Sequence, residues 1–172
     1  MMDINLDNEF THVSRLHAQI ALMVNPSKMF FSKSFGYALR SLLYIASARK
    51  EKGYVPLDQI ITQLNLPRQF VARILKTLAK EKILISFKGP TGGYMIDQRG
   101  KDLTLLQLME LIDGSRIELC VMKNKACDET RLCPAHDSFL KARGELSKVL
   151  SKTTIGELAK KGGADFVKSL CE

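Results

Sequence analysis

The chain lacks several features that would indicate a secreted, membrane-bound or disordered protein. It has no tryptophan, only 7% aromatic residues, and no apolar run long enough to cross a bilayer. The first residues include Asp3, Asp7 and Glu9, whereas a secretory signal peptide begins with positive charge. The 45% hydrophobic content is nevertheless normal for a folded chain of 172 residues. We therefore expect a globular, cytoplasmic protein without a membrane partner.

Acidic residues are scarce relative to basic ones, 18 against 26, which gives a net charge of +8. The excess is concentrated between Pro67 and Lys101, where eight basic residues stand against two acidic ones. A local excess of this kind is typical of a surface that contacts phosphates. The charge distribution therefore favours a polyanionic partner over a protein that is merely basic and soluble.

The apolar spacing from Ser34 onward predicts successive helices, with Pro67 opening the third after a turn at 65–67. The buried face of the third helix is predicted to comprise Val71, Ile74, Leu75 and Leu78. Its opposite, polar and basic face is predicted to comprise Gln69, Ala72, Arg73 and Lys76. Two short helices joined by a tight turn, the second basic on its outer face, are typical of a helix-turn-helix.

Two β-like runs follow, at 83–87 and 94–96, and a glycine- and proline-rich segment at 88–93 joins them. This pattern predicts a β-hairpin, which directly after a recognition-type helix is interpreted as the wing of a winged helix. The glycines would let the backbone approach a phosphate or the minor-groove floor, and Lys88 would supply charge. An ordinary solvent-exposed hairpin is the alternative.

The C-terminal part is predicted to be helical again. Thr104 and Thr154 each begin a capping-box sequence, and Pro134 is expected to open a long helix between them. The long helix carries an apolar stripe at three-four-three spacing, formed by Phe139, Ala142, Leu146 and Val149. The stripe favours pairing with a second copy of the chain, and packing within one monomer is the alternative.

The predicted fold class is mainly α with a small β-hairpin wing, a winged helix-turn-helix followed by a long dimerisation helix. We expect residues 1–28 to be an N-terminal extension and 29–101 to be the DNA-binding domain. Residues 102–172 are expected to hold a cysteine loop and the dimerisation helices.

Three of the four cysteines lie close together, Cys120, Cys127 and Cys133, and His136 follows three residues later. Three thiolates and an imidazole can complete a four-ligand shell around a metal, and clustered cysteines in a reducing compartment indicate such a site. A Cys3His zinc finger would have the same ligand order, but no aromatic residue lies between Cys120 and His136 to stack on bases. No nucleotide-binding glycine motif or Ser/His/Asp set supports an enzyme.

Taken together, these residues resemble a known family, the IscR/NsrR/CymR-type winged-helix transcription regulators of bacteria (the Rrf-two superfamily). The resemblance runs from about Met29 to Lys160 and is most specific in the wing sequence Lys88–Tyr94. Its other marks are Phe31-Ser32-Lys33, Tyr37-Ala38-Leu39-Arg40, Leu103-Thr104-Leu105, the cysteine triplet and Thr154-Ile155-Gly156-Glu157-Leu158.

The resemblance implies a non-enzymatic, homodimeric repressor or activator that binds double-stranded DNA and carries an iron–sulfur cluster, 2Fe-2S or 4Fe-4S. By the family pattern Cys120, Cys127 and Cys133 would bind iron, with His136 as the fourth ligand. Ala72 departs from the pattern, because cluster-sensing members often carry Glu there, so we expect a different operator. A zinc-bearing or cluster-free regulator controlled by a protein partner, and an iron–sulfur electron carrier, are the alternatives.

The DNA contacts follow from the same interpretation. Gln69 and Arg73 are expected to contact bases. Phosphates or the minor groove are assigned to Arg68, Lys76 and Lys88 together with the wing glycines Gly89, Gly92 and Gly93.

Overall fold

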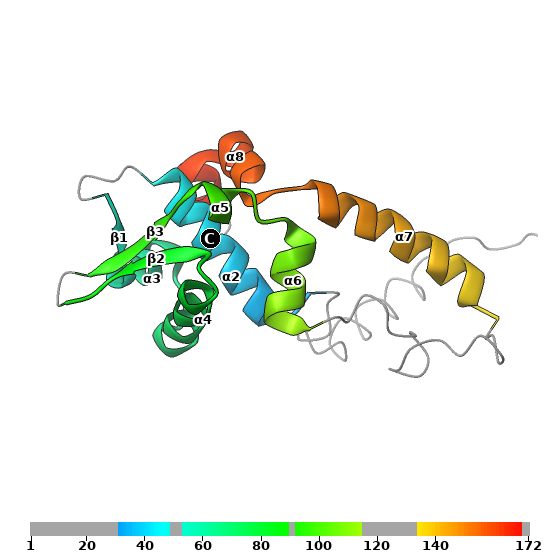
Figure 1. The fold of residues 1–172 in the computed structure, drawn as a ribbon, viewed down its shortest axis with the longest axis horizontal. Helices are drawn as coiled ribbons and strands as arrows, with labels where there is room; N and C mark the ends of the chain where they lie inside the picture. Colours follow the sequence, from blue (N-terminus) through cyan, green and yellow to red (C-terminus); the bar gives the residue numbers. More distant parts are fainter. Residues whose placement is uncertain (1–30, 49–52, 90–91, 115–133, 170–172) are drawn as a thin grey trace, which may run out of the picture. The chain divides into compact units, whose positions relative to one another are not determined.

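Helices form most of the computed structural model, which describes residues 31–48, 53–89, 92–114 and 134–169 (Figure 1). By its contacts the chain divides into two units, Met1–Ser32 and Lys33–Glu172, and the fold below belongs to the second. In chain order its elements are α2 (Lys33–Ser47), β1 (Val55–Pro56), α3 (Leu57–Leu64), α4 (Arg68–Lys80), β2 (Leu84–Phe87), β3 (Gly93–Ile96), α5 (Gln98–Lys101), α6 (Leu105–Asp113), α7 (His136–Lys152) and α8 (Ile155–Ser169).

The central helix is α2, which packs against α4, α6, β3 and α8. Its buried residues Ala38, Leu42 and Ile45 recur every three or four positions and therefore form one continuous stripe. The C-terminal helix α8 contributes the fully buried Ile155 to the fold. The winged helix and the C-terminal segment are thus packed together through α2 and α8, while the expected division after residue 101 remains a prediction.

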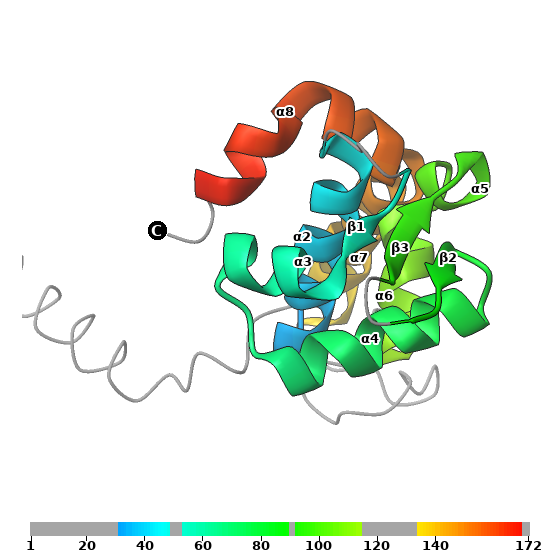
Figure 2. The same ribbon diagram turned by 90° about the vertical axis from the view of Figure 1, so that its left-hand side faces the viewer.

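The predicted helix-turn-helix is confirmed as α3 and α4 (Figure 2). Asn65 ends α3 in the left-handed conformation, with φ 45°, which an asparagine tolerates better than most residues. Pro67 is the N-cap of α4, so the helix begins at Arg68, one residue after the predicted opening at Pro67. The predicted core face of α4 is also confirmed, because its buried residues are Val71, Ile74, Leu75 and Leu78.

The predicted hairpin is confirmed as β2 and β3, which pair antiparallel with Phe87 opposite Gly93. A third strand, β1, pairs with the other edge of β3, so the strand order is β1-β3-β2. The sequence pattern did not indicate β1 because it has two residues and one is Pro56. It did not indicate α5 either, a single turn capped by Asp97.

An isolated antiparallel bridge joins the segments that precede α6 and α8. The Leu105 N–H donates to the Thr153 carbonyl, and the Ile155 N–H donates to the Leu103 carbonyl, each at 3.0 Å. The start of α6 is therefore fixed directly to the start of α8, although the two lie far apart in the sequence.

Both predicted capping boxes are confirmed beside this bridge. The Thr104 hydroxyl accepts from the Gln107 N–H at 3.2 Å, and the Gln107 side chain accepts from the Thr104 N–H at 3.0 Å. The Thr154 and Glu157 pair repeats the arrangement at 3.2 and 3.3 Å. Each box satisfies N–H groups that the first turn of a helix leaves without a partner.

The start of α7 corrects the sequence-based expectation. Pro134 does not open the helix, because Pro134 and Ala135 form a turn and α7 begins at His136. His136 thus occupies the first helical position. The helix follows α6 in the described chain (Figure 1) and packs against it. Leu150, near the end of α7, is buried.

Candidate nucleic-acid interface

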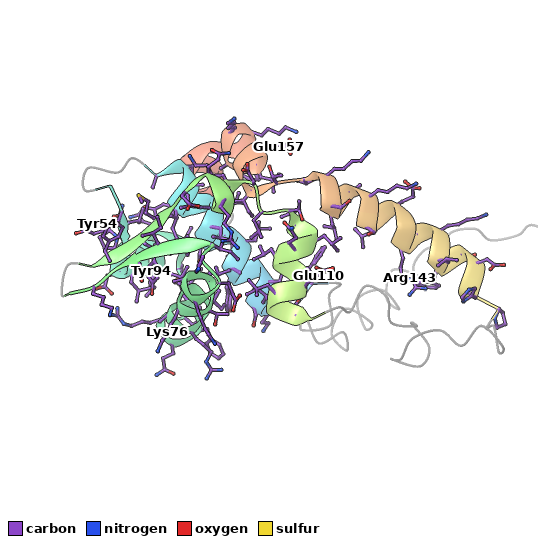
Figure 3. All side chains as sticks on the ribbon, viewed as in Figure 1. Tyr54, Lys76, Tyr94, Glu110, Arg143 and Glu157 are labelled. Carbon is purple, nitrogen blue, oxygen red and sulfur yellow. The ribbon has the colours of Figure 1, made fainter. Side chains whose placement is uncertain are left out.

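The outer face of α4 is polar and positively charged along its length. Gln69, Arg73, Lys76 and Lys80 are all exposed, and the helix contains no acidic residue. Lys76 points outward from the helix in Figure 3. Because neighbouring positions on one helix face recur every three or four residues, these side chains form one basic surface. They include three of the predicted DNA-contacting residues.

Arg68, the first residue of α4, forms an ion pair with Asp58 in the first turn of α3. Both side chains are exposed, so the pair contributes little to stability. It does orient the guanidinium and places a carboxylate beside a predicted phosphate contact. Sequence patterns could not indicate this role of Asp58, because the pair depends on how α3 and α4 are packed.

A concave cavity of about 430 Å³ lies between the wing and the first residues of α3 and α4. Arg68 and Lys88 both line it, together with the Asp58 carboxylate. Two of the predicted phosphate-contacting side chains therefore share one surface, although they belong to different elements.

The backbone around Gly92 and Gly93 leaves no room for a side chain. A Cβ on Gly92 would lie 2.1 Å from the Phe87 carbonyl oxygen, and one on Gly93 would lie 2.4 Å from the Val55 carbonyl oxygen. Gly89 has open space around it but takes a φ of 110°, which other residues rarely adopt. The hairpin itself thus requires these glycines, and their approach to DNA remains a prediction.

An aromatic pair joins the residue before β1 to the end of β2. The rings of Tyr54 and Phe87 stack with centroids 4.9 Å apart and an interplanar angle of 25°. The Tyr54 ring lies next to Gly93, 2.8 Å from where a Cβ would stand. On β3, burial raises the pKa of Tyr94 because it disfavours the phenolate, so this side chain remains a neutral hydroxyl.

The predicted metal ligands are only partly within the described chain. Cys120, Cys127 and Cys133 lie outside the described residues, whereas His136 is half-buried at the first position of α7. Among the residues that the structure describes, no three His, Cys, Asp or Glu side chains form a group that could hold a metal. The four-residue ligand set therefore remains a prediction.

The apolar stripe of α7 is largely open to solvent in the single chain. Phe139 is 37% exposed and Val149 is 59% exposed, while Ala142 is exposed and Leu146 is half-buried. Among the residues that the structure describes, no neighbouring element fully covers these side chains, and their pairing with a second copy remains a prediction.

One large apolar residue on α4 was not among the predicted site residues. Phe70 is 59% exposed, next to Gln69 and three residues before Arg73. Apolar periodicity assigns core residues, and it gives no signal for an apolar side chain that faces solvent.

No helix within the described ranges is long and apolar enough to cross a membrane. Residues 31–161 match the model of the Rrf2 family, described as an iron-dependent transcriptional regulator. A protein of Aquifex aeolicus named as an HTH-type transcriptional regulator is 29% identical over 133 residues, 76% of this chain and 91% of that protein. IscR of Vibrio atlanticus, named as an HTH-type transcriptional regulator, is 25% identical over 125 residues, 72% of this chain and 71% of that protein.

Solved structures share the fold. CymR (YrzC), the global cysteine regulator of B. subtilis, has a TM-score of 0.64 at 20% identity and covers 77% of this chain and 98% of its own. IscR of T. potens has a TM-score of 0.60 at 17% identity and covers 80% of this chain and 90% of its own. The family and these relatives are transcriptional regulators, not enzymes. On the match over residues 31–161, the chain belongs to the Rrf2 family of transcriptional regulators.

Proposed function

We propose that the protein is a homodimeric DNA-binding regulator whose operator affinity depends on an iron–sulfur cluster held by Cys120, Cys127, Cys133 and His136. The observation that carries this proposal is the path of the chain on either side of the cysteine loop. Helix α6 leads into the loop and α7 leads out of it, and α6 begins at the bridge with the segment before α8. Because α8 packs against α2 and α2 packs against α4, a change in the loop has a direct route to the DNA-contacting helix.

Helix α4 would enter the major groove, with Gln69 and Arg73 at base edges. Lys76 would bind a phosphate from the same helix, and Arg68 and Lys88 would do so from the cavity beside the wing. The absence of acidic residues on α4 supports this assignment, because a carboxylate on that face would repel the DNA backbone.

The exposed stripe on α7 would be covered by the same stripe of a second copy. Two copies related by twofold symmetry would present two α4 helices to successive major grooves, about 34 Å apart along the duplex. The exposure of Phe139 and Val149 supports a partner helix over packing within the monomer.

The chemistry of the four residues fits the proposed group, since thiolates and imidazole suit an iron–sulfur centre. His136 at the first position of α7 lies at the positive end of the helix dipole, and Lys123, Lys125 and Arg131 occur in the same loop. Positive charge nearby favours the thiolate form, which is the form that binds iron. When bound, the cluster would supply a redox-sensitive centre that oxidants can alter. The family's description as iron-dependent is further support.

The test begins with protein purified without oxygen. We expect a visible absorption spectrum, iron and acid-labile sulfide, and their loss in Cys127→Ala but not in the matched control Cys171→Ala. The two states should then differ in affinity for DNA selected from a random pool. Equal affinities would refute cluster control, and zinc in place of iron would indicate the zinc-bearing alternative. A metal-free loop would favour the cluster-free alternative.

A further inference from the structure

Phe70 is the feature of α4 that the basic surface does not explain. Its side chain is 59% exposed, while the neighbouring exposed positions of the helix are polar or charged. Burying a phenylalanine side chain stabilises a fold relative to leaving it in water. The fold does not gain this stabilisation at Phe70, although four other apolar residues of α4 are buried.

The position of Phe70 is that of a base-contacting residue. It is the third residue of α4, and the N-terminal residues of a recognition helix are those that reach base edges. At 100° per residue it lies on the same side of the helix as Arg73 and Thr77, both exposed. It lies roughly opposite Arg68, which lines the cavity at the wing. Phe70 and the wing therefore flank the basic face from its two sides.

The charge of this surface identifies its partner. Arg73, Lys76 and Lys80 are exposed on α4 and the helix has no acidic residue, so the surface complements DNA. The major groove is mostly polar, and the apolar group that it offers is the 5-methyl group of thymine, which phenylalanine can contact.

From this geometry and charge we propose that Phe70 is a specificity-determining residue that contacts a thymine methyl group in the major groove, beside the base contacted by Arg73. The inference rests on the proposed DNA-binding function. It adds an apolar contact to the polar contacts of Gln69 and Arg73, and so predicts that the operator requires thymine at one position of each half-site.

The experiment replaces each thymidine of the selected operator in turn with deoxyuridine, which lacks only the methyl group. At one position per half-site, we expect the wild-type affinity to fall about four- to tenfold, the effect of removing one methyl group from a contact. Phe70→Ser should bind the thymidine and deoxyuridine operators equally, whereas Phe70→Leu should keep part of the preference. The matched control is Phe166→Ser, which changes a phenylalanine of similar exposure on α8 and should discriminate like the wild type.

The results that would contradict this inference each point to a different cause. If no deoxyuridine substitution weakens binding, or if Phe70→Ser discriminates like the wild type, Phe70 contacts no methyl group. If Phe70→Ser instead lowers the sedimentation coefficient of the free protein, Phe70 belongs to a protein–protein contact. If the wild type selects no common DNA sequence at all, the proposed function itself is wrong and the inference falls with it.

Discussion

Replacing Gly93 with alanine tests how the wing is held to the rest of the fold. Gly93 begins β3, opposite Pro56 of β1 and Phe87 of β2. An added Cβ would lie 2.4 Å from the Val55 carbonyl oxygen and 2.7 Å from its carbon, and it would also meet the Tyr54 ring. The oxygen would have to move to beyond 3.0 Å, and because it belongs to the backbone, β1 would have to move with it.

The expected cost follows from that displacement. Forcing an extra methyl group into a packed site costs about 1–3 kcal/mol. At roughly 2–4 °C per kcal/mol for a chain of this size, Gly93→Ala should lower the melting temperature by about 2–12 °C. Thermal unfolding followed by circular dichroism measures this change, and operator affinity should fall with it because the wing is displaced.

Gly36→Ala is the matched control for this experiment. Gly36 lies in α2 with no atom within 4 Å of the added Cβ. Alanine in a helix interior is about 0.5–1 kcal/mol more favourable than glycine, so this variant should melt slightly higher. An unchanged or raised melting temperature for Gly93→Ala would show that the Val55 carbonyl leaves room for a side chain at position 93.

Three other predictions concern the bridge, the basic face and the stripe. Leu105→Pro removes the N–H that donates to the Thr153 carbonyl, while proline is well tolerated at the first position of a helix. In urea unfolding, this variant should therefore be about 1 kcal/mol less stable than Leu105→Ala. Equal stabilities would show that the hydrogen bond contributes nothing. Lys76→Ala should weaken binding to all DNA sequences alike and reduce the salt slope by about 1, unlike Lys148→Ala on α7; an unchanged slope would exclude a phosphate contact. Val149→Asp should raise the dimer dissociation constant at least roughly 100-fold in sedimentation equilibrium, because it would bury an unpaired charge; an intact dimer would place the interface elsewhere.

The parts of the fold that were predicted from sequence depend on local signals. The buried face of α4, the two capping boxes and the hairpin each follow from residues within a few positions of one another. The parts that were not predicted depend on packing between distant segments. The two-residue strand β1 exists because β3 pairs with it, and the bridge before α6 exists because α8 packs nearby.

The candidate site divides in the same way. Arg73 and Lys76 were predicted from helical periodicity and are exposed as expected. Asp58 was not, because its pairing with Arg68 depends on the angle between two helices. Phe70 was not, because an apolar residue in a helix is ordinarily assigned to the core, and exposure is known only once the neighbouring elements are placed. The three cysteines lie outside the described residues, so the metal site stays a prediction.

The bridge between Thr104 and Thr154 has a consequence for how this architecture can vary. It holds the two ends of residues 105–153 together, so the chain leaves and rejoins the rest of the fold at one place, which two backbone hydrogen bonds fix. Backbone bonds place little restriction on side-chain identity at the bridge itself, but α6 packs against α2, and Leu108, Met109 and Leu150 are buried, so α6 and the end of α7 have to be kept. We expect that a different sensing segment, placed between α6 and the end of α7, would leave the winged helix folded.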